Sequence, residues 1–207
     1  MEENKNLTID GYILTGGAAS RMGGDKALLT ISGRTFVQQI AAGLSRVTRD
    51  VFVVGGKTPG LTTVPDIPVD GGQTKSSMTG LYSALRHSRS EWVFVVACDM
   101  PFVTAELFEA IIELSDGAKC AVIPMSSDGV AQPLCGLYRV SACVEKAESA
   151  LKNGQRSLQR LLDDVDAQRV GFEHFQGLAG SEHLFMNVNT PKEYALALRL
   201  ADSEPAG

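Results

Sequence analysis

Residues 13–29 read ILTGGAASRMGGDKALL, a short apolar run followed by a segment that contains four glycines, an arginine and a lysine. Glycine loses more conformational freedom on folding than any other residue, so a glycine cluster is typical of a backbone that a ligand approaches closely. The cations Arg21 and Lys26 indicate that this ligand is anionic, and a phosphate is the obvious choice. The stretch therefore predicts a strand over 11–15 that leads into a phosphate-binding loop.

The loop matches neither of the two commonest phosphate-binding motifs. In a Walker loop Gly and Lys are adjacent and Ser or Thr follows, but here Asp25 separates Gly24 from Lys26 and Ala27 comes next. The segment that starts at Gly16 also lacks the G-x-G-x-x-G pattern of dinucleotide-binding domains. A third class of nucleotide-binding protein stays open, and the rest of the chain has to identify it.

Apolar runs that are typical of strands alternate with helical patterns along the chain. The expected strands are 11–15, 51–54, 62–64, 92–98, 120–124, 133–138 and 168–175. The expected helices are 35–44, 78–88, 105–114, 141–154, 157–165 and one that starts at residue 191. Thr35 with Gln38, and Thr190 with Glu193, fit the capping box that begins a helix. This alternation predicts an α/β fold with a mostly parallel sheet covered on both faces.

Length and composition are those of an ordinary globular protein. With 207 residues, 44% of them hydrophobic, we expect one domain over residues 1–207 with a flexible tail at about 203–207. The net charge of −5 argues against a nucleic-acid-binding protein, which normally carries a basic face. The longest apolar run, 92–98, is too short to span a membrane, and the acidic start MEENKN is unlike a secretory signal. We therefore expect a cytoplasmic protein that binds neither nucleic acid nor membrane.

Three segments fit the rule that ligands of such sheets bind beyond the carboxyl ends of the strands: the glycine-rich loop, CDMP (98–101) and VDGGQTKSSMTGL (69–81). Asp99 is either a turn residue or a carboxylate that holds Mg²⁺ against phosphate oxygens. Arg21 and Lys26 are either solvated loop charges or phosphate ligands. The sequence contains no nucleophile elbow and no His-rich cluster. Its chemistry is therefore expected to be positioning and charge neutralisation, as in phosphoryl and nucleotidyl transfer.

The segment LTGGAASRMGGDKALL closely resembles the L-A-G-G-x-x-x-R-M-G-x-x-K signature of nucleotidyltransferases, and specifically of the molybdenum cofactor guanylyltransferases (MobA family). The first block alone is shared by many sugar-phosphate nucleotidyltransferases, whereas its combination with N-V-N-T-P is more specific. The resemblance spans nearly the whole chain in the family's order, because it continues in ACDMPFVT (97–104), QPLCGLYR (132–139), LKNGQRSLQRLL (151–162) and FMNVNTPKEY (185–194).

The resemblance implies a Rossmann-like, three-layer α/β/α nucleotidyltransferase fold. It implies an Mg²⁺-dependent transfer of GMP from GTP to the phosphate of molybdenum-molybdopterin, with release of pyrophosphate. A molybdenum-insertion protein and an accessory GTP-binding protein are further partners that it allows. By motif match the catalytic residues are Arg21, Lys26 and Asp99, the last also the metal ligand; the nucleotide-binding residues are Leu14, Gly16, Gly17, Lys26, Asp70 and Asp99; the acceptor-binding residues are Asn187 and Asn189.

The chain departs from the family's pattern at three places. Thr15 stands where the family usually has Ala, and glycines at 55–56 follow a strand that commonly leads to Asn. The family's P-G-x-G-P-L-A-G loop is replaced by GGQTKSSMTG. Counting back through this loop without gaps makes Asp70 the nucleotide-binding aspartate, and Asp66 is the alternative.

The altered loop resembles the S-S-S-L-R-x-G-L segment of molybdenum cofactor cytidylyltransferases, which use CTP. Those enzymes usually carry L-A-A-G in the first block and D-I-D-T-P in the last, whereas this chain has Gly16, Gly17 and N-V-N-T-P. Glycine at position 16 leaves more room for the larger purine, which favours GTP. An alternative from another class is a non-catalytic nucleotide-binding protein of the same fold. The presence of Arg21, Lys26 and Asp99 argues against it.

Overall fold

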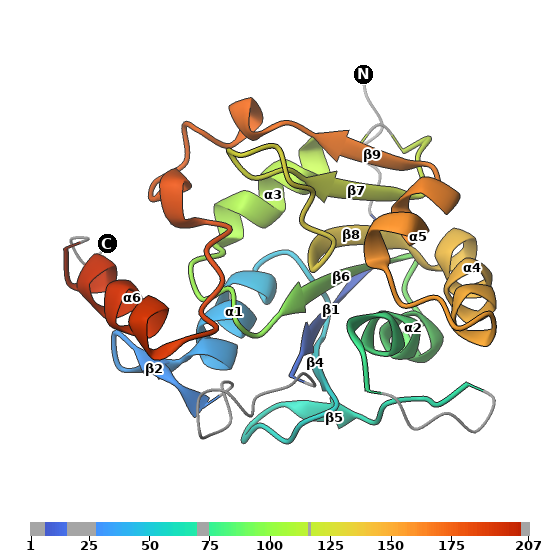
Figure 1. The fold of residues 1–207 in the computed structure, drawn as a ribbon, viewed down its shortest axis with the longest axis horizontal. Coiled ribbons are helices and arrows are strands. Elements are labelled where there is room, and N and C mark those ends of the chain that lie inside the picture. The colour runs from blue at the N-terminus through green and yellow to red at the C-terminus, as the bar shows by residue number, and fades with distance from the viewer. Residues whose placement is uncertain (1–6, 16–27, 70–74, 116, 204–207) are drawn as a thin grey trace.

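The computed structural model describes residues 7–15, 28–69, 75–115 and 117–203, which form a central sheet with helices on both faces (Figure 1). The strands of this sheet are β1 Ile9–Leu14, β4 Val51–Val54, β5 Thr62–Val64, β6 Trp92–Ala97, β7 Ala121–Pro124, β8 Cys135–Arg139 and β9 Ala167–Val170. The α-helices are α1 Phe36–Leu44, α2 Ser77–His87, α3 Ala105–Glu113, α4 Val140–Lys152, α5 Leu158–Asp164 and α6 Pro191–Ser203. A small antiparallel pair precedes α1, formed by β2 Thr30–Ile31 and β3 Arg34–Thr35.

The strands follow the order β5-β4-β1-β6-β8-β7-β9. All neighbours are parallel except β8, which runs antiparallel between β6 and β7. The mostly parallel sheet expected from the sequence is therefore confirmed. After β1 the chain adds β4 and then β5 on one side of it, and then crosses to β6, which lies on the other side of β1. This reversal creates a topological switch point at the carboxyl ends of β1 and β6, where α/β sheets bind their ligands.

Each face of the sheet is covered by its own set of helices (Figure 1). Helices α1 and α3 pack on one face, where Phe94 of β6 meets Phe108 of α3 with ring centroids 5.1 Å apart. Helices α2, α4 and α5 cover the other face. Every residue of β6 is buried, as its unbroken apolar sequence predicts for a central strand. Helix α6 lies apart from these layers, against the β2–β3 pair (Figure 1).

Two helices begin where the sequence places a capping box. At α1 the Gln38 amide N–H donates to Thr35 Oγ1 at 3.2 Å, and the Thr35 amide N–H donates to Gln38 Oε1 at 2.9 Å. At α6 the same exchange joins Thr190 and Glu193, with distances of 2.9 and 3.2 Å. Both boxes satisfy amide groups that have no partner inside the helix, which fixes the point at which each helix starts.

The strand expected over 168–175 is correct only over residues 168–170. Strand β9 ends at Val170, and a 3₁₀ turn follows over Phe172–His174. The pairing stops there because the partner strand β7 ends at Pro124, which lies opposite Val170. Phe175 is nevertheless fully buried. The alternation of apolar residues thus reflects burial through a turn rather than a longer strand.

Candidate active site

The carboxyl ends of β1, β4 and β6 are aligned at one edge of the sheet. Leu14 lies opposite Val54 of β4 and opposite Ala97 of β6. One residue further on, the Thr15 amide N–H donates to the Val54 carbonyl at 3.0 Å, and the Cys98 amide N–H donates to the Leu14 carbonyl at 3.1 Å. The segments after β1 and β6 therefore leave the sheet side by side, at the switch point.

Helix α2 begins at the same edge, because it connects the parallel strands β5 and β6. Ser76 caps it: the Thr79 amide N–H donates to Ser76 Oγ at 3.1 Å. The helix packs tightly on β1, since a Cβ added to Gly80 would lie 2.9 Å from Leu14 Cδ1. The free amide groups at the start of a helix attract phosphate. Leu14 is buried in this contact, so the expected nucleotide contact at Leu14 stays a prediction.

Asp99, the expected metal ligand, follows β6 directly and is half-buried. Its carbonyl accepts a hydrogen bond of 2.8 Å from the amide N–H of Val188, which is fully buried. Val188 stands between the two expected acceptor-binding residues, Asn187, which is exposed, and Asn189, which is half-buried. The fold therefore brings Asp99 beside both asparagines, although they are far apart in the sequence.

The donor set at Asp99 fits Mg²⁺, which prefers carboxylate oxygen and usually binds through one or two carboxylates with water and substrate phosphates. Among the described residues, no group of three or more His, Cys, Asp or Glu side chains could hold a metal ion. Within the described part of the chain, a magnesium ion at Asp99 would therefore be held by that carboxylate and by the phosphates of a bound substrate, rather than by an all-protein cage.

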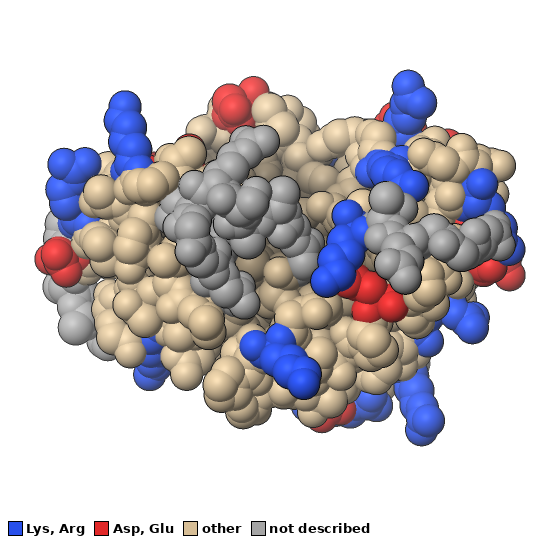
Figure 2. Space-filling view, turned by 60° about the horizontal axis from the view of Figure 1, so that its bottom comes forward, with Lys and Arg blue, Asp and Glu red and all other residues tan. Residues whose placement is uncertain are grey.

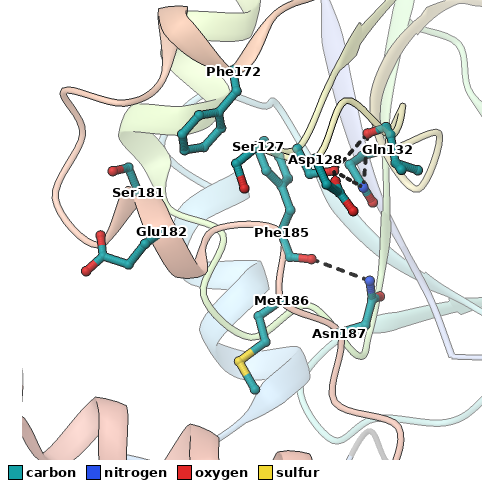
Figure 3. A pocket seen from close by; sticks show the side chains of 11 residues that line it. Ser127, Asp128, Gln132, Phe172, Ser181, Glu182, Phe185, Met186 and Asn187 are labelled. Atoms are coloured by element: carbon teal, nitrogen blue, oxygen red, sulfur yellow. Dashed lines mark hydrogen bonds between the residues drawn. The ribbon is translucent and has the colours of Figure 1, made fainter.

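A pocket of about 370 Å³ adjoins Asn187 (Figure 3). The segments that line it place it on the β7–β8–β9 side of Asp99. Its lining comes from the turn after β7, from Gln132 ahead of β8 and from the segment after β9. In the turn, Ser126 Oγ donates to Asp128 Oδ1 at 2.6 Å and accepts from Gln132 Nε2 at 3.0 Å. The hydrogen bond from Ser126 lowers the pKa of the Asp128 carboxyl. We call this pocket, which is lined by residues within 126–132, Phe172 and residues within 181–187, the turn pocket.

The turn pocket was not among the features expected from the sequence. Two signals were available: the Asp128-Gly129 pair, which is typical of a tight turn, and Gln132, the first residue of a block that carries the family resemblance. Neither signal could show that the turn folds back toward Asn187. That proximity depends on β7 and β9 being neighbours in the sheet.

Of the remaining expected site residues, the structure describes only Asp66. Asp66, the alternative nucleotide-binding aspartate, is half-buried and follows β5 at the same edge of the sheet. The choice between Asp66 and Asp70 stays a prediction. The residues that lie outside the described ranges are Gly16, Gly17, Arg21, Lys26 and Asp70.

The rest of the described surface offers less to a nucleotide. In the face shown in Figure 2, the described Lys and Arg side chains are scattered, some of them toward the middle of the face, and they form no continuous basic patch. A second pocket, of about 290 Å³, lies at the opposite edge of the sheet and is lined by Asp10, Arg49, Phe52, His87 and Arg89. That edge holds the amino ends of the parallel strands, away from the switch point. No helix in the described part of the chain has the length and apolar character needed to cross a bilayer.

Comparison with known proteins identifies close relatives. The sequence model of the MobA-like NTP transferase domain matches residues 11–170. The chain is 32% identical over 206 residues to a protein of Pelotomaculum thermopropionicum named as a probable molybdenum cofactor guanylyltransferase, with 97% of each chain covered. It is 30% identical over 190 residues to the molybdenum cofactor guanylyltransferase of Yersinia pseudotuberculosis, with 89% of this chain and 92% of the relative covered.

Solved structures share the fold. The molybdopterin-guanine dinucleotide biosynthesis protein A of Archaeoglobus fulgidus superposes with a TM-score of 0.78 at 22% identity, over 94% of this chain and all of that one. The 2-C-methyl-D-erythritol 4-phosphate cytidylyltransferase of Thermus thermophilus gives a TM-score of 0.66 at 19% identity, over 92% and 98% of the two chains. At these identities the likeness extends to the fold alone.

Proposed function

Since this chain belongs to the MobA-like NTP transferase family and is a nucleotidyltransferase, we propose that it transfers GMP from GTP to the phosphate of molybdenum-loaded molybdopterin. The products would be the guanine dinucleotide form of the cofactor and pyrophosphate. The names of the relatives support both the guanine nucleotide and the molybdenum cofactor as substrates.

The observation that carries the proposal is the hydrogen bond of 2.8 Å from the Val188 amide N–H to the Asp99 carbonyl. It fixes Asp99 between the end of β1, where the glycine-rich segment starts, and the segment with Asn187 and Asn189. A transferase that joins two phosphates has to hold two substrates on either side of the reacting phosphorus. The ends of β1 and β6, with the 187–189 segment, provide two such sides at one edge of the sheet.

In the proposed reaction an oxygen of the acceptor phosphate attacks the α-phosphorus of GTP and forms a new P–O bond. The bond between the α-phosphorus and the bridging oxygen breaks, and pyrophosphate leaves with that electron pair. Arg21 and Lys26 would offset the charge of the triphosphate, and Asp99 would hold the magnesium ion. When bound, Mg²⁺ supplies positive charge to phosphate oxygens. Asn187 and Asn189 would orient the acceptor.

The alternative base, cytosine, is suggested by the serines of the altered loop. Ser76 has a structural role that accounts for its presence, since it caps α2 through Thr79. This serine therefore does not favour CTP by itself. Gly16, Gly17 and N-V-N-T-P, together with the guanylyltransferase names of the relatives, support GTP.

Thermal unfolding with Mg²⁺ and each of the four nucleoside triphosphates tests the choice of base. A ligand at 100 times its dissociation constant stabilises a protein by about 2.7 kcal/mol, or roughly 5–10 °C for a chain of this size. We expect the largest shift with GTP. A larger shift with CTP than with GTP would indicate that the chain is a cytidylyltransferase instead.

Pyrophosphate release with GTP, Mg²⁺ and molybdenum-loaded molybdopterin tests the transfer itself. We expect release that requires all three components, together with a product containing one guanine and one pterin. GTP binding without turnover under these conditions would favour the non-catalytic alternative.

A further inference from the structure

We propose that the second pocket, at the amino edge of the sheet, binds a phosphate ester of a small aromatic molecule. This amino-edge pocket has a volume of about 290 Å³ and is lined by Asp10, Arg49, Phe52, His87 and Arg89. Asp10 lies four residues before Leu14 on β1, and a strand rises about 3.3 Å per residue, so about 13 Å of strand separates the pocket from the switch point. The site is therefore separate from that of the proposed reaction, and the inference does not depend on the proposed function.

The carboxylate among the lining residues is already used by the protein. Asp10 is buried, and its Oδ2 accepts a hydrogen bond of 2.7 Å from Ser88 Oγ. Arg49 Nη2 lies 3.1 Å from Asp10 Oδ1 and 3.4 Å from Oδ2. Because Oδ1 is itself fully buried, it is not accessible to a ligand. Asp10 therefore holds Arg49 in place and does not offer an acceptor to the pocket.

The ring of His87 is oriented by Tyr12. Tyr12 Oη lies 2.9 Å from His87 Nδ1. Burial raises the pKa of the Tyr12 hydroxyl, so this group keeps its proton and donates it to Nδ1. A neutral imidazole whose Nδ1 accepts a hydrogen bond carries its proton on Nε2. His87 Nε2–H is therefore a donor that remains for a ligand in the pocket.

Arg89 supplies a positive charge that the described part of the protein does not offset. It is exposed, and its side chain forms no ion pair or hydrogen bond with any described residue. The charge of Arg49, by contrast, is offset by Asp10 and by Asp50, whose Oδ2 lies 3.0 Å from Arg49 Nε. The Nη1 group of Arg49 takes part in neither contact and remains a donor.

The pocket thus offers donors from three side chains, those of Arg49, His87 and Arg89. It requires a ligand group that accepts hydrogen bonds and carries negative charge. A phosphate monoester has three terminal oxygens, one for each side chain, whereas a carboxylate has only two. The guanidinium fork of arginine also matches the geometry of phosphate. These features favour a phosphate group.

The size and the aromatic surface of the pocket favour an organic ester over free phosphate. The ring centroids of Phe52 and His87 lie 4.8 Å apart with an interplanar angle of 71°, and Phe52 stacks on Tyr12 at 5.1 Å. These contacts hold the Phe52 ring in place as an apolar wall, against which an aromatic ring can pack. The volume lies at the lower end of the roughly 300–1,000 Å³ typical of small-molecule sites. Inorganic phosphate alone would leave most of it empty.

Phenyl phosphate is a suitable probe because it joins the two parts that the pocket is expected to bind. It is titrated into the full chain by calorimetry, beside inorganic phosphate and phenol, and we expect it to bind more tightly than either. The chain has three histidines, so the ring signals of His87 in an NMR spectrum can be assigned by their loss in His87→Gln. We expect these signals to shift as phenyl phosphate binds, whereas those of His174 and His183 stay in place.

Arg89→Gln removes the uncompensated charge, and because Arg89 is exposed we expect an unchanged melting temperature. Since hydrogen bonds to a charged group are lost, the dissociation constant for phenyl phosphate should rise about ten- to a hundredfold. Arg86→Gln, at an exposed position of α2 that does not line the pocket, is the matched control and should bind as the parent does. Phe52→Leu should reduce the preference for phenyl phosphate over inorganic phosphate, since both probes are compared in the same variant.

Competition with GTP separates this site from that of the proposed reaction. Saturating GTP with Mg²⁺ should leave the shift of the His87 signals by phenyl phosphate unchanged, and Arg89→Gln should keep the parent's thermal shift with GTP. Equal affinity for phenyl phosphate in the parent and in Arg89→Gln, or displacement of the probe by GTP, would overturn the inference. Equal affinity for phenyl phosphate and inorganic phosphate would overturn the aromatic ester as the ligand. None of these results bears on the transfer of GMP, which the release of pyrophosphate tests.

Discussion

The hydroxyl of Thr15 joins the segments that follow β1 and β4. Thr15 Oγ1 donates to the Val54 carbonyl at 2.9 Å and accepts from the Gly56 amide N–H at 2.7 Å. A Cβ added to residue 56 would lie only 2.5 Å from this oxygen. A side chain at 56 and the Thr15 hydroxyl therefore exclude each other. The two departures from the family's pattern, Thr in place of Ala and glycines in place of Asn, are thus coupled at the switch point.

This coupling predicts that substitutions at the two positions are not additive. Gly56→Ala should lower the free energy of unfolding by about 1–3 kcal/mol, because the new methyl group displaces the hydroxyl. Thr15→Ala should cost about 1 kcal/mol for its hydrogen bonds. In the double variant the methyl group meets no hydroxyl, so we expect a loss smaller than the sum by about 0.5–3 kcal/mol. Urea unfolding of the four proteins measures this, and strictly additive values would contradict it.

Asp99→Asn is expected to lower the rate of pyrophosphate release by about 10²–10³-fold. Asparagine keeps the shape of the side chain but removes the negative charge that would hold Mg²⁺. The hydrogen bond from Val188 goes to the backbone carbonyl of residue 99, so the substitution leaves it in place. The melting temperature should therefore change little. A rate within a few-fold of the parent would make Asp99 a turn residue.

Lys26→Ala is expected to weaken GTP binding much more than it affects stability. A lysine on the glycine-rich segment would contribute charge to the triphosphate rather than apolar contacts to the core. Isothermal titration with GTP and Mg²⁺, together with a melting curve of the free protein, compares the two effects. A melting temperature that falls in proportion to the affinity would indicate a structural role. Lys146→Ala, at an exposed position on α4, is the control.

Glu193→Ala should affect both stability and the acceptor side of the site. Glu193 Oε2 accepts from the amides of Asn189 and Thr190 at 2.6 and 2.9 Å. Loss of this cap should cost about 1–2 kcal/mol. Because Asn189 loses its restraint, we also expect a higher KM for the acceptor with an unchanged KM for GTP. Glu145→Ala, on an exposed position of α4, should change neither. An unchanged KM for the acceptor in Glu193→Ala would show that the cap stabilises the helix but does not affect acceptor binding.

Local patterns predicted the secondary structure well where local interactions decide it. The capping boxes at Thr35 and Thr190 fixed two helix starts, since their partners lie within three residues. The apolar run over 92–98 identified the buried central strand. The strand expected over 168–175 was partly wrong because its length depends on where β7 ends at Pro124, a residue remote in the sequence. Alternation of apolar residues alone cannot predict where such a strand ends.

The candidate site likewise combines features that local sequence predicts with contacts that only the tertiary structure sets. The sequence by itself determined the class of fold and the residue types beyond the strand ends, because strands, turns and charged loops are local in origin. Only the tertiary structure placed Val188 against Asp99, the turn of Asp128 beside Asn187, and Thr15 against Gly56. These contacts depend on which strands are neighbours in the sheet, and β8 between β6 and β7 shows that chain order does not give that arrangement. Neighbouring strands are chosen by the packing of the whole core, which no short stretch of sequence contains.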